Sequence, residues 1–135
     1  MQNMNLQNLK TIIAKVLVGF PDVQAAYLFG SWAKGKAGRD SDIDLALVTS
    51  LPLGSEKIDI LAALTAEGID NVDLISLDTD DVVLRFEAVS PNRLIYARAD
   101  FDHGSYYSRV IREYFDFQPY LDRQRDAMKR RLAGG

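Results

Sequence analysis

The chain has 135 residues, and its 16 basic and 19 acidic side chains give a net charge of -3. It contains no cysteine, which excludes disulfides, thiolate metal sites and thiol nucleophiles. It shows neither a secretory leader nor an apolar run of membrane-spanning length, so we expect one cytoplasmic domain over residues 1–135. The acidic balance argues against direct nucleic-acid binding.

The first half of the chain alternates between helical and strand patterns. Apolar residues at helical spacing predict a helix over 6–17, which Gly19 and Pro21 end. Short apolar runs predict strands over 23–29 and 43–48. These three segments would supply one helix and two central strands of a small sheet.

A second helix and a third strand are predicted next. Ser55 is expected to cap a helix that ends near Gly68. Its predicted apolar face consists of Ile58, Leu61 and Leu64. A third strand is expected over 71–77.

The C-terminal third is predicted to be mostly helical. Asp80 or Asp81 is expected to cap a short helix that reaches Val89. An edge strand over 93–97 follows, and then a helical segment over about 101–132, in which Pro119 predicts a kink or break. The predicted fold class is therefore α/β (α+β), a small mixed β-sheet packed by helices.

A glycine–serine pair follows the first predicted strand. Gly30 lets the backbone approach a phosphate closely, and the Ser31 hydroxyl can donate to a phosphate oxygen or cap the next turn. Residues 30–36 come near to a P-loop, but Ala37 stands where that motif needs Ser or Thr to hold magnesium. We therefore expect a phosphate-binding turn of another kind; an ordinary strand-to-helix turn is the alternative.

Two carboxylates open the second predicted strand. Asp42 and Asp44 are two residues apart, so they point to the same face of a strand and can share one divalent cation. Asp73, on the polar side of the third predicted strand, is the candidate for a third ligand of Mg²⁺. The competing interpretation is a solvated strand start. Four nearby carboxylates compete with Asp73 for this role: Asp70, Asp78, Asp80 and Asp81.

Polar residues of the intervening loop complete the predicted site. Arg39 and Ser41 are candidates to bind the phosphates of a nucleotide, although Ser41 is equally suited to cap a turn. Lys34 and Lys36 would add positive charge, and Trp32 is expected to pack rather than to stack on a base. A cation site beside a phosphate-binding turn predicts metal-dependent nucleotidyl transfer.

The remaining polar and aromatic residues suggest no separate chemistry. His103 is expected to be solvated, because the chain has no other histidine. An aromatic set is expected to pack, with an extension into a partner interface left open: Tyr106, Tyr107, Tyr114, Phe115, Phe117 and Tyr120. The alternating charges after residue 121 are typical of a solvated helix.

The pair Gly30-Ser31, ten residues, and then Asp42-Ile43-Asp44 resemble the signature of the DNA polymerase beta-type nucleotidyltransferase superfamily. The small size resembles its minimal nucleotidyltransferase (MNT) group, the MntA-type antitoxins. The likeness extends to Asp73 in its strand and, more weakly, to the stretch 114–119 before the terminal helix.

The resemblance implies both a site and a partner. It implies that Asp42, Asp44 and Asp73 bind magnesium and that Gly30 and Ser31 contact the phosphates of ATP. It also implies an antitoxin of a type VII toxin–antitoxin pair, which transfers AMP to a tyrosine of a HEPN-domain ribonuclease toxin. Two alternatives remain open: a binding-only antitoxin that sequesters the toxin, and a nucleotidyltransferase acting on a small molecule or an RNA end.

Overall fold

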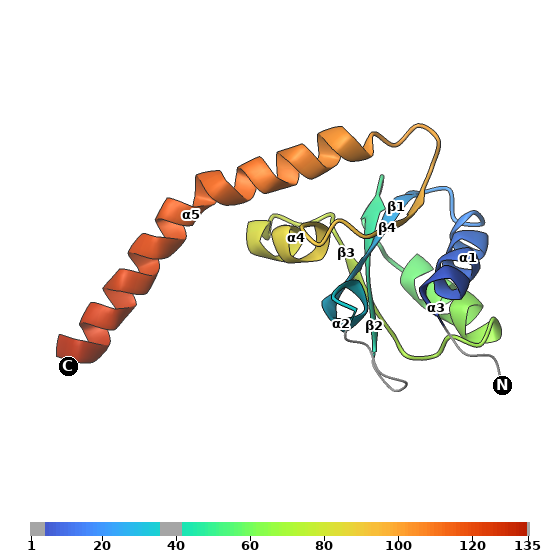
Figure 1. Cartoon of the computed structure of the whole chain (residues 1–135), viewed down its shortest axis with the longest axis horizontal. Helices are drawn as coiled ribbons and strands as arrows, with labels where there is room; N and C mark the ends of the chain where they lie inside the picture. The colour runs from blue at the N-terminus through green and yellow to red at the C-terminus, as the bar shows by residue number, and fades with distance from the viewer. Residues whose placement is uncertain (1–4, 36–41, 135) are drawn as a thin grey trace.

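A computed structural model describes residues 5–35 and 42–134 of the chain (Figure 1). These residues form four strands and five helices. The strands are β1 (Val23–Phe29), β2 (Ile43–Thr49), β3 (Val72–Ser76) and β4 (Leu94–Ala97). The helices are α1 (Leu6–Leu17), α2 (Gly30–Ala33), α3 (Glu56–Ala66), α4 (Val82–Val89) and α5 (His103–Gly134).

The four strands form one mixed sheet in the order β3-β2-β1-β4. Strand β1 is antiparallel to both of its neighbours, whereas β2 and β3 run parallel. The β2–α3–β3 connection supplies the crossover that a parallel pair requires. The prediction that β4 is an edge strand is confirmed.

One face of the sheet carries most of the apolar core. Helices α1 and α3 cover this face, and their buried side chains pack on alternate residues of the strands. On β2 these residues are Ile43, Leu45 and Leu47, each buried. Since successive residues of a strand point to opposite faces, Asp44 and Ala46 point to the other side.

The other face is covered by α4 and by the first part of α5. Its buried set is smaller and consists of three alanines, two valines and one leucine around Tyr27, which is fully buried. The Tyr27 hydroxyl lies 2.8 Å from Nδ1 of His103, and Nε2 of the same ring lies 2.9 Å from Oδ1 of Asn92. The prediction of a solvated His103 is therefore wrong, because a buried hydroxyl 76 positions away in sequence pairs with the ring.

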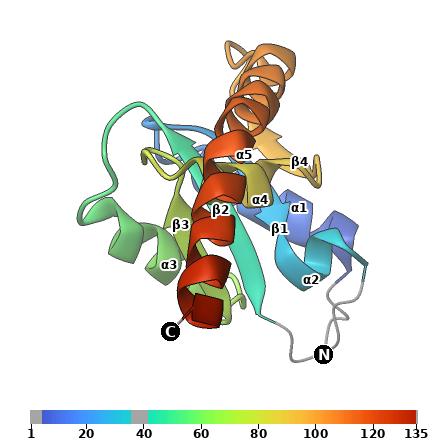
Figure 2. The ribbon, with the colours of Figure 1, turned by 90° about the vertical axis from the view of Figure 1, so that its left-hand side faces the viewer.

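Helix α5 is the longest element and runs without a break through Pro119. It changes direction about midway, and its C-terminal part extends away from the sheet (Figure 1). Figure 2, seen from the side toward which α5 projects, shows the helix in front of α4 and the sheet. No helix in the described part of the chain is long and apolar enough to cross a membrane.

One of the two predicted side-chain caps forms, because Ser55 precedes α3 without a capping hydrogen bond, and one predicted helix face is wrong. The side chain of Asp81 accepts a hydrogen bond from the Leu84 amide at 3.0 Å and caps α4 as predicted. In α3, by contrast, Ile58 is 71% exposed and Ile60 is buried. The helix presents Ile60 and Leu64 to the core because these residues are four apart and lie on one face.

Candidate functional site

The register between β2 and β3 places two acidic side chains side by side. Asp44 and Asp73 are directly paired across the parallel strands. Their flanking residues Ile43, Leu45 and Leu74 are buried on the α1/α3 side, so both carboxylates lie on the opposite face. Asp42 is exposed and directly precedes β2, two positions from Asp44.

The glycine–serine turn lies against the same carboxylates. Phe29, the last residue of β1, pairs with Asp44 across the antiparallel strands, and the chain then turns at Gly30 into the short helix α2. Gly30 has a φ of +69°, and a Cβ at this position would lie 2.1 Å from Oδ2 of Asp44. Only glycine fits this contact, both because of its backbone angle and because the carboxylate occupies the space.

Ser31 is partly exposed and follows Gly30 in the first turn of α2. The structure therefore brings Gly30, Ser31, Asp44 and Asp73 together at one end of the sheet, with Asp42 at its rim. Arg39 and Ser41 lie outside the described residues.

Three carboxyl groups, those of Asp42, Asp44 and Asp73, crowd negative charge at this end of the sheet. The pKa of Asp44 is raised, first by burial of its carboxyl group and then by repulsion from Asp73 and Asp42. A divalent cation relieves such repulsion, and carboxylate oxygens are the ligands that Mg²⁺ prefers. The donor set therefore fits a magnesium ion shared with the phosphates of a substrate.

The carboxylates do not form a closed cage. Within residues 5–35 and 42–134, no three histidine, cysteine or acidic side chains are grouped closely enough to hold a metal. Mg²⁺ commonly binds through one or two carboxylates together with waters and substrate phosphates, so an open pair such as Asp44 and Asp73 suits it. Asp42 would add a ligand from the rim.

Two further residues support the turn. Trp32 packs against the α1/α3 core, as expected from the sequence, and its indole Nε1 is buried without a hydrogen-bond partner. Arg93, just before β4, donates from Nε to the carbonyl of Ala33 at 3.3 Å and so ties α2 to the sheet edge. The sequence provided no signal for this role of Arg93, since the two residues are 60 positions apart.

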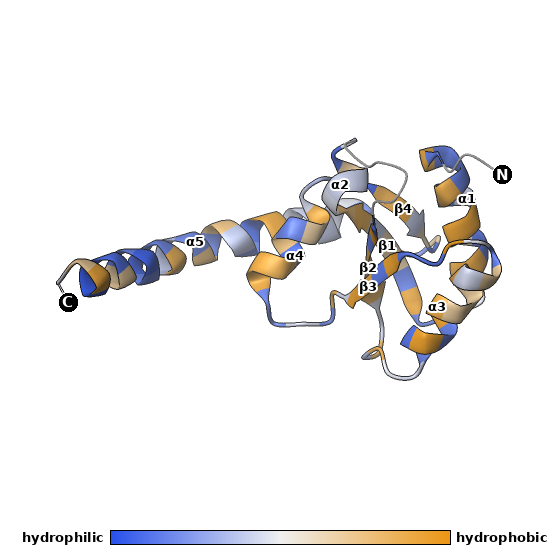
Figure 3. Cartoon of the chain, turned by 90° about the horizontal axis from the view of Figure 1, so that it is seen from below, coloured by the Kyte–Doolittle hydropathy of each residue, from blue (hydrophilic) through white to orange (hydrophobic). Residues whose placement is uncertain are grey.

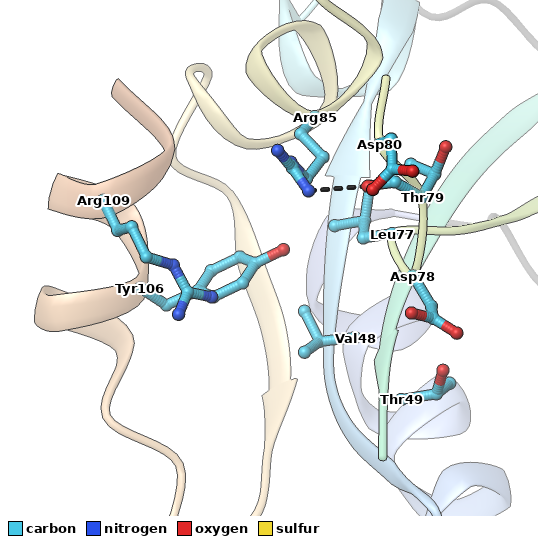
Figure 4. A pocket seen from close by; sticks show the side chains of 9 residues that line it. All are labelled: Val48, Thr49, Leu77, Asp78, Thr79, Asp80, Arg85, Tyr106 and Arg109. Carbon is cyan, nitrogen blue, oxygen red and sulfur yellow. Dashed lines mark hydrogen bonds between the residues drawn. The ribbon is translucent and has the colours of Figure 1, made fainter. Parts of the chain in front are cut away.

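A second polar region lies at the opposite end of β2 (Figure 4). A cavity of about 410 Å³ opens there between Thr49, the β3–α4 loop and Tyr106 of α5. Its Arg85 donates to the Thr79 carbonyl and to Glu113, each at 2.6 Å. None of the predicted site residues lines this cavity, and its Arg85 is already engaged by neighbouring oxygens. We assign it no role in nucleotide chemistry.

Comparison with known proteins shows the family of the chain. Residues 11–101 match the family described as "Polymerase beta, Nucleotidyltransferase". This range includes Gly30, Ser31, Asp42, Asp44 and Asp73 and ends before α5 begins.

One curated relative and several solved structures are similar to the chain. The protein adenylyltransferase MntA of Shewanella oneidensis is 32% identical over 90 residues, which span 66% of this chain and 65% of that protein. A chain of a toxin–antitoxin crystal structure with AMP-PNP has a TM-score of 0.75 at 25% identity, covering 89% of this chain and 98% of that one. A chain of a MntA–HpeT variant complex has a TM-score of 0.73 at 25% identity, covering 94% and 99%.

Proposed function

Because the chain belongs to the polymerase beta nucleotidyltransferase family, we propose that it is an antitoxin that transfers AMP from ATP to a tyrosine of a HEPN ribonuclease toxin. The activity of the 32% identical relative, a protein adenylyltransferase, supports AMP transfer to a protein. The likeness to a toxin–antitoxin chain solved with AMP-PNP supports ATP as substrate and a toxin as partner. The HEPN class and the tyrosine acceptor follow from the resemblance to MNT antitoxins.

One observation carries the proposal: the Gly30 backbone lies directly against the Asp44 carboxylate, beside Asp73. A phosphate bound at the turn would therefore lie next to the acidic pair. Asp42, Asp44 and Asp73 would hold Mg²⁺, which would neutralise charge on the triphosphate. The backbone at Gly30 and the hydroxyl of Ser31 would position the phosphates.

In the proposed transfer, the protein itself takes part in little covalent chemistry. The acceptor hydroxyl oxygen attacks the α-phosphorus in line, the bond from that phosphorus to the bridging oxygen breaks, and pyrophosphate leaves. Asp73, which pairs with Asp44 across the strands, would help to activate the acceptor hydroxyl by taking up its proton. Positioning and charge neutralisation supply most of the rate in such transfers.

Mass spectrometry of the toxin partner tests this proposal. The wild-type chain should add one or more AMP units to the toxin when ATP and Mg²⁺ are present. Asp42→Ala should reduce transfer by roughly 100-fold or more, since it removes charge stabilisation from the reacting phosphates. Gly30→Ala should also lose transfer, because its Cβ would displace Asp44.

Asp59→Ala is the matched control, since this exposed carboxylate lies on α3, which covers the opposite face of the sheet. It should leave transfer unchanged. If an unmodified toxin is still neutralised in the presence of Asp42→Ala, the chain is a binding-only antitoxin and the proposal fails. If AMP appears on a small molecule or an RNA end instead, the activity stands but the acceptor is wrong.

A further inference from the structure

One face of helix α5 carries mainly apolar residues at helical spacing, interrupted by polar residues such as Gln124. In the first part, the stripe runs through His103, Tyr106, Val110 and Tyr114, which are spaced three or four residues apart and so share one face. This part packs on the body: Val110 is buried, and the Tyr114 ring stacks on Phe86 of α4 with centroids 3.8 Å apart. The first half of the stripe is therefore covered by the protein itself.

The same stripe continues toward the C-terminus, where burial decreases: Phe117 and Leu121 are partly buried, and Met128 and Leu132 are exposed. It runs through Phe117, Leu121, Gln124, Met128 and Leu132 at the same spacing. Met128 is 59% exposed and Leu132 is 79% exposed. Figures 1 and 3 show this part of α5 extending away from the sheet, with hydrophobic residues interspersed along a mostly hydrophilic helix.

The charge of this segment differs in sign from that of the rest of the molecule. Residues 121–134 contain five lysines or arginines and two aspartates, a net charge of +3. Since the whole chain carries -3, the remaining residues carry -6. Arg125 and Arg131 are each three residues from Met128 and so lie beside the stripe. Arg123 is two residues from Leu121, and Arg130 is two residues from Met128. Both therefore lie on the opposite side of the helix.

We propose that the face formed by Phe117, Leu121, Met128 and Leu132 docks an acidic amphipathic helix of a protein partner. An amphipathic helix is stabilised when it buries its apolar face against a second apolar stripe. The arginines beside the stripe select a partner helix whose flanking positions are Asp or Glu.

Two other occupants fit less well. Pairing with α5 of a second copy would bring two segments of charge +3 together, and like charges at such contacts are destabilising. RNA would use the arginines but would leave the apolar stripe exposed. The docking surface goes beyond the nucleotidyl-transfer proposal and does not depend on it.

The test uses a defined probe and the full chain. A synthetic helical peptide with a leucine stripe flanked by glutamates is titrated into the isotopically labelled protein, and amide shifts are followed by NMR without nucleotide. A second peptide has the same stripe flanked by lysines. The glutamate peptide should shift amides of residues 117–132, and the lysine peptide should bind at least about tenfold more weakly.

Variants of exposed residues then separate the contributions of the stripe and its charges. The double variant Met128→Gln and Leu132→Gln should weaken the glutamate peptide about tenfold or more, since it removes the apolar contact but leaves charge and helix propensity intact. Arg125→Gln with Arg131→Gln should also weaken it. Arg123→Gln with Arg130→Gln removes the same charge from the opposite side and should have little effect.

Several results would overturn the proposal. Equal weakening by the two arginine pairs would mean non-specific charge attraction. Shifts confined to the sheet or to α4, or no shifts at all, would mean that this face does not dock such a helix. Sedimentation of the free protein as a dimer that the Met128→Gln and Leu132→Gln variant abolishes would assign the surface to a second copy. Single-stranded RNA that shifts residues 117–132 while the peptide does not would assign it to nucleic acid.

Discussion

The two faces of the sheet differ in what their side chains do. The α1/α3 face is lined by large aliphatic residues, most of them fully buried, and carries no acidic side chain from the described strands. The α4/α5 face has a smaller core and also carries Asp44, Asp73 and the hydroxyl of Tyr27. Burial of apolar area therefore stabilises the fold chiefly from one side, which leaves the other side able to hold polar groups that chemistry requires.

Substitution on the α1/α3 face should give the largest loss of stability. Leu45 is fully buried in the centre of β2, and Leu45→Ala would remove apolar contacts and leave a cavity. We expect the free energy of unfolding to fall by about 3 kcal/mol. Urea denaturation followed by circular dichroism measures this loss. In the control variant Leu51→Ala, at a residue that is 59% exposed, the free energy of unfolding should decrease by far less. Equal losses in the two variants would remove the distinction between core and surface on which the comparison depends.

A smaller loss of stability is expected when the buried hydroxyl on the α4/α5 face is removed. Tyr27→Phe keeps the ring and its packing but removes the hydroxyl that forms a hydrogen bond with Nδ1 of His103. The expected loss is about 1 kcal/mol, measured in the same denaturation experiment. Amide hydrogen exchange should also rise in the first turns of α5, because His103 joins that helix to the sheet. An unchanged free energy of unfolding would mean that water replaces this bond at no net cost.

The smallest expected change is an increase in stability, caused by a substitution at Asp44. The pKa of Asp44 is raised by burial and by repulsion from Asp73 and Asp42, so the folded state binds its proton more tightly than the unfolded state does. Ionised Asp44 is therefore destabilising at neutral pH, and Asp44→Asn should raise Tm by roughly 1 to 2 °C at pH 7 when no divalent ion is present.

This gain should disappear with acid. Well below the ordinary carboxyl pKa of 3.8, Asp44 is protonated in both states and the cost is absent. The cost grows as pH rises from 3.8 to the raised folded value and is fully present above it. Thermal melts across this range measure the difference, and Asp59→Asn serves as the control. A lower Tm for Asp44→Asn at pH 7 would show that the carboxylate stabilises the fold and would contradict the contrast between the two faces.

Local patterns predicted the elements well where the pattern had a single interpretation. The helix from Leu6 and the strand from Val23 to Phe29 have the predicted bounds, because apolar spacing and the Gly19–Pro21 breaker agree. The side of α3 that faces the core was less predictable, because Ile58 and Ile60 are both apolar and only packing decides which of them is buried. His103 was mispredicted for a related reason: its partners Tyr27 and Asn92 come from distant segments.

The sequence by itself determined the candidate site residues, because the chemistry of Gly30, Ser31 and the aspartates is local and the Asp42-Ile43-Asp44 spacing follows from strand geometry. Only the tertiary structure decided that Asp73 pairs with Asp44 and that Gly30 lies against the same carboxylate, since strand order and register join segments far apart in the chain. It also decided that the stripe on α5 is covered near its start and exposed near its C-terminal end, because that depends on where the sheet and α4 end.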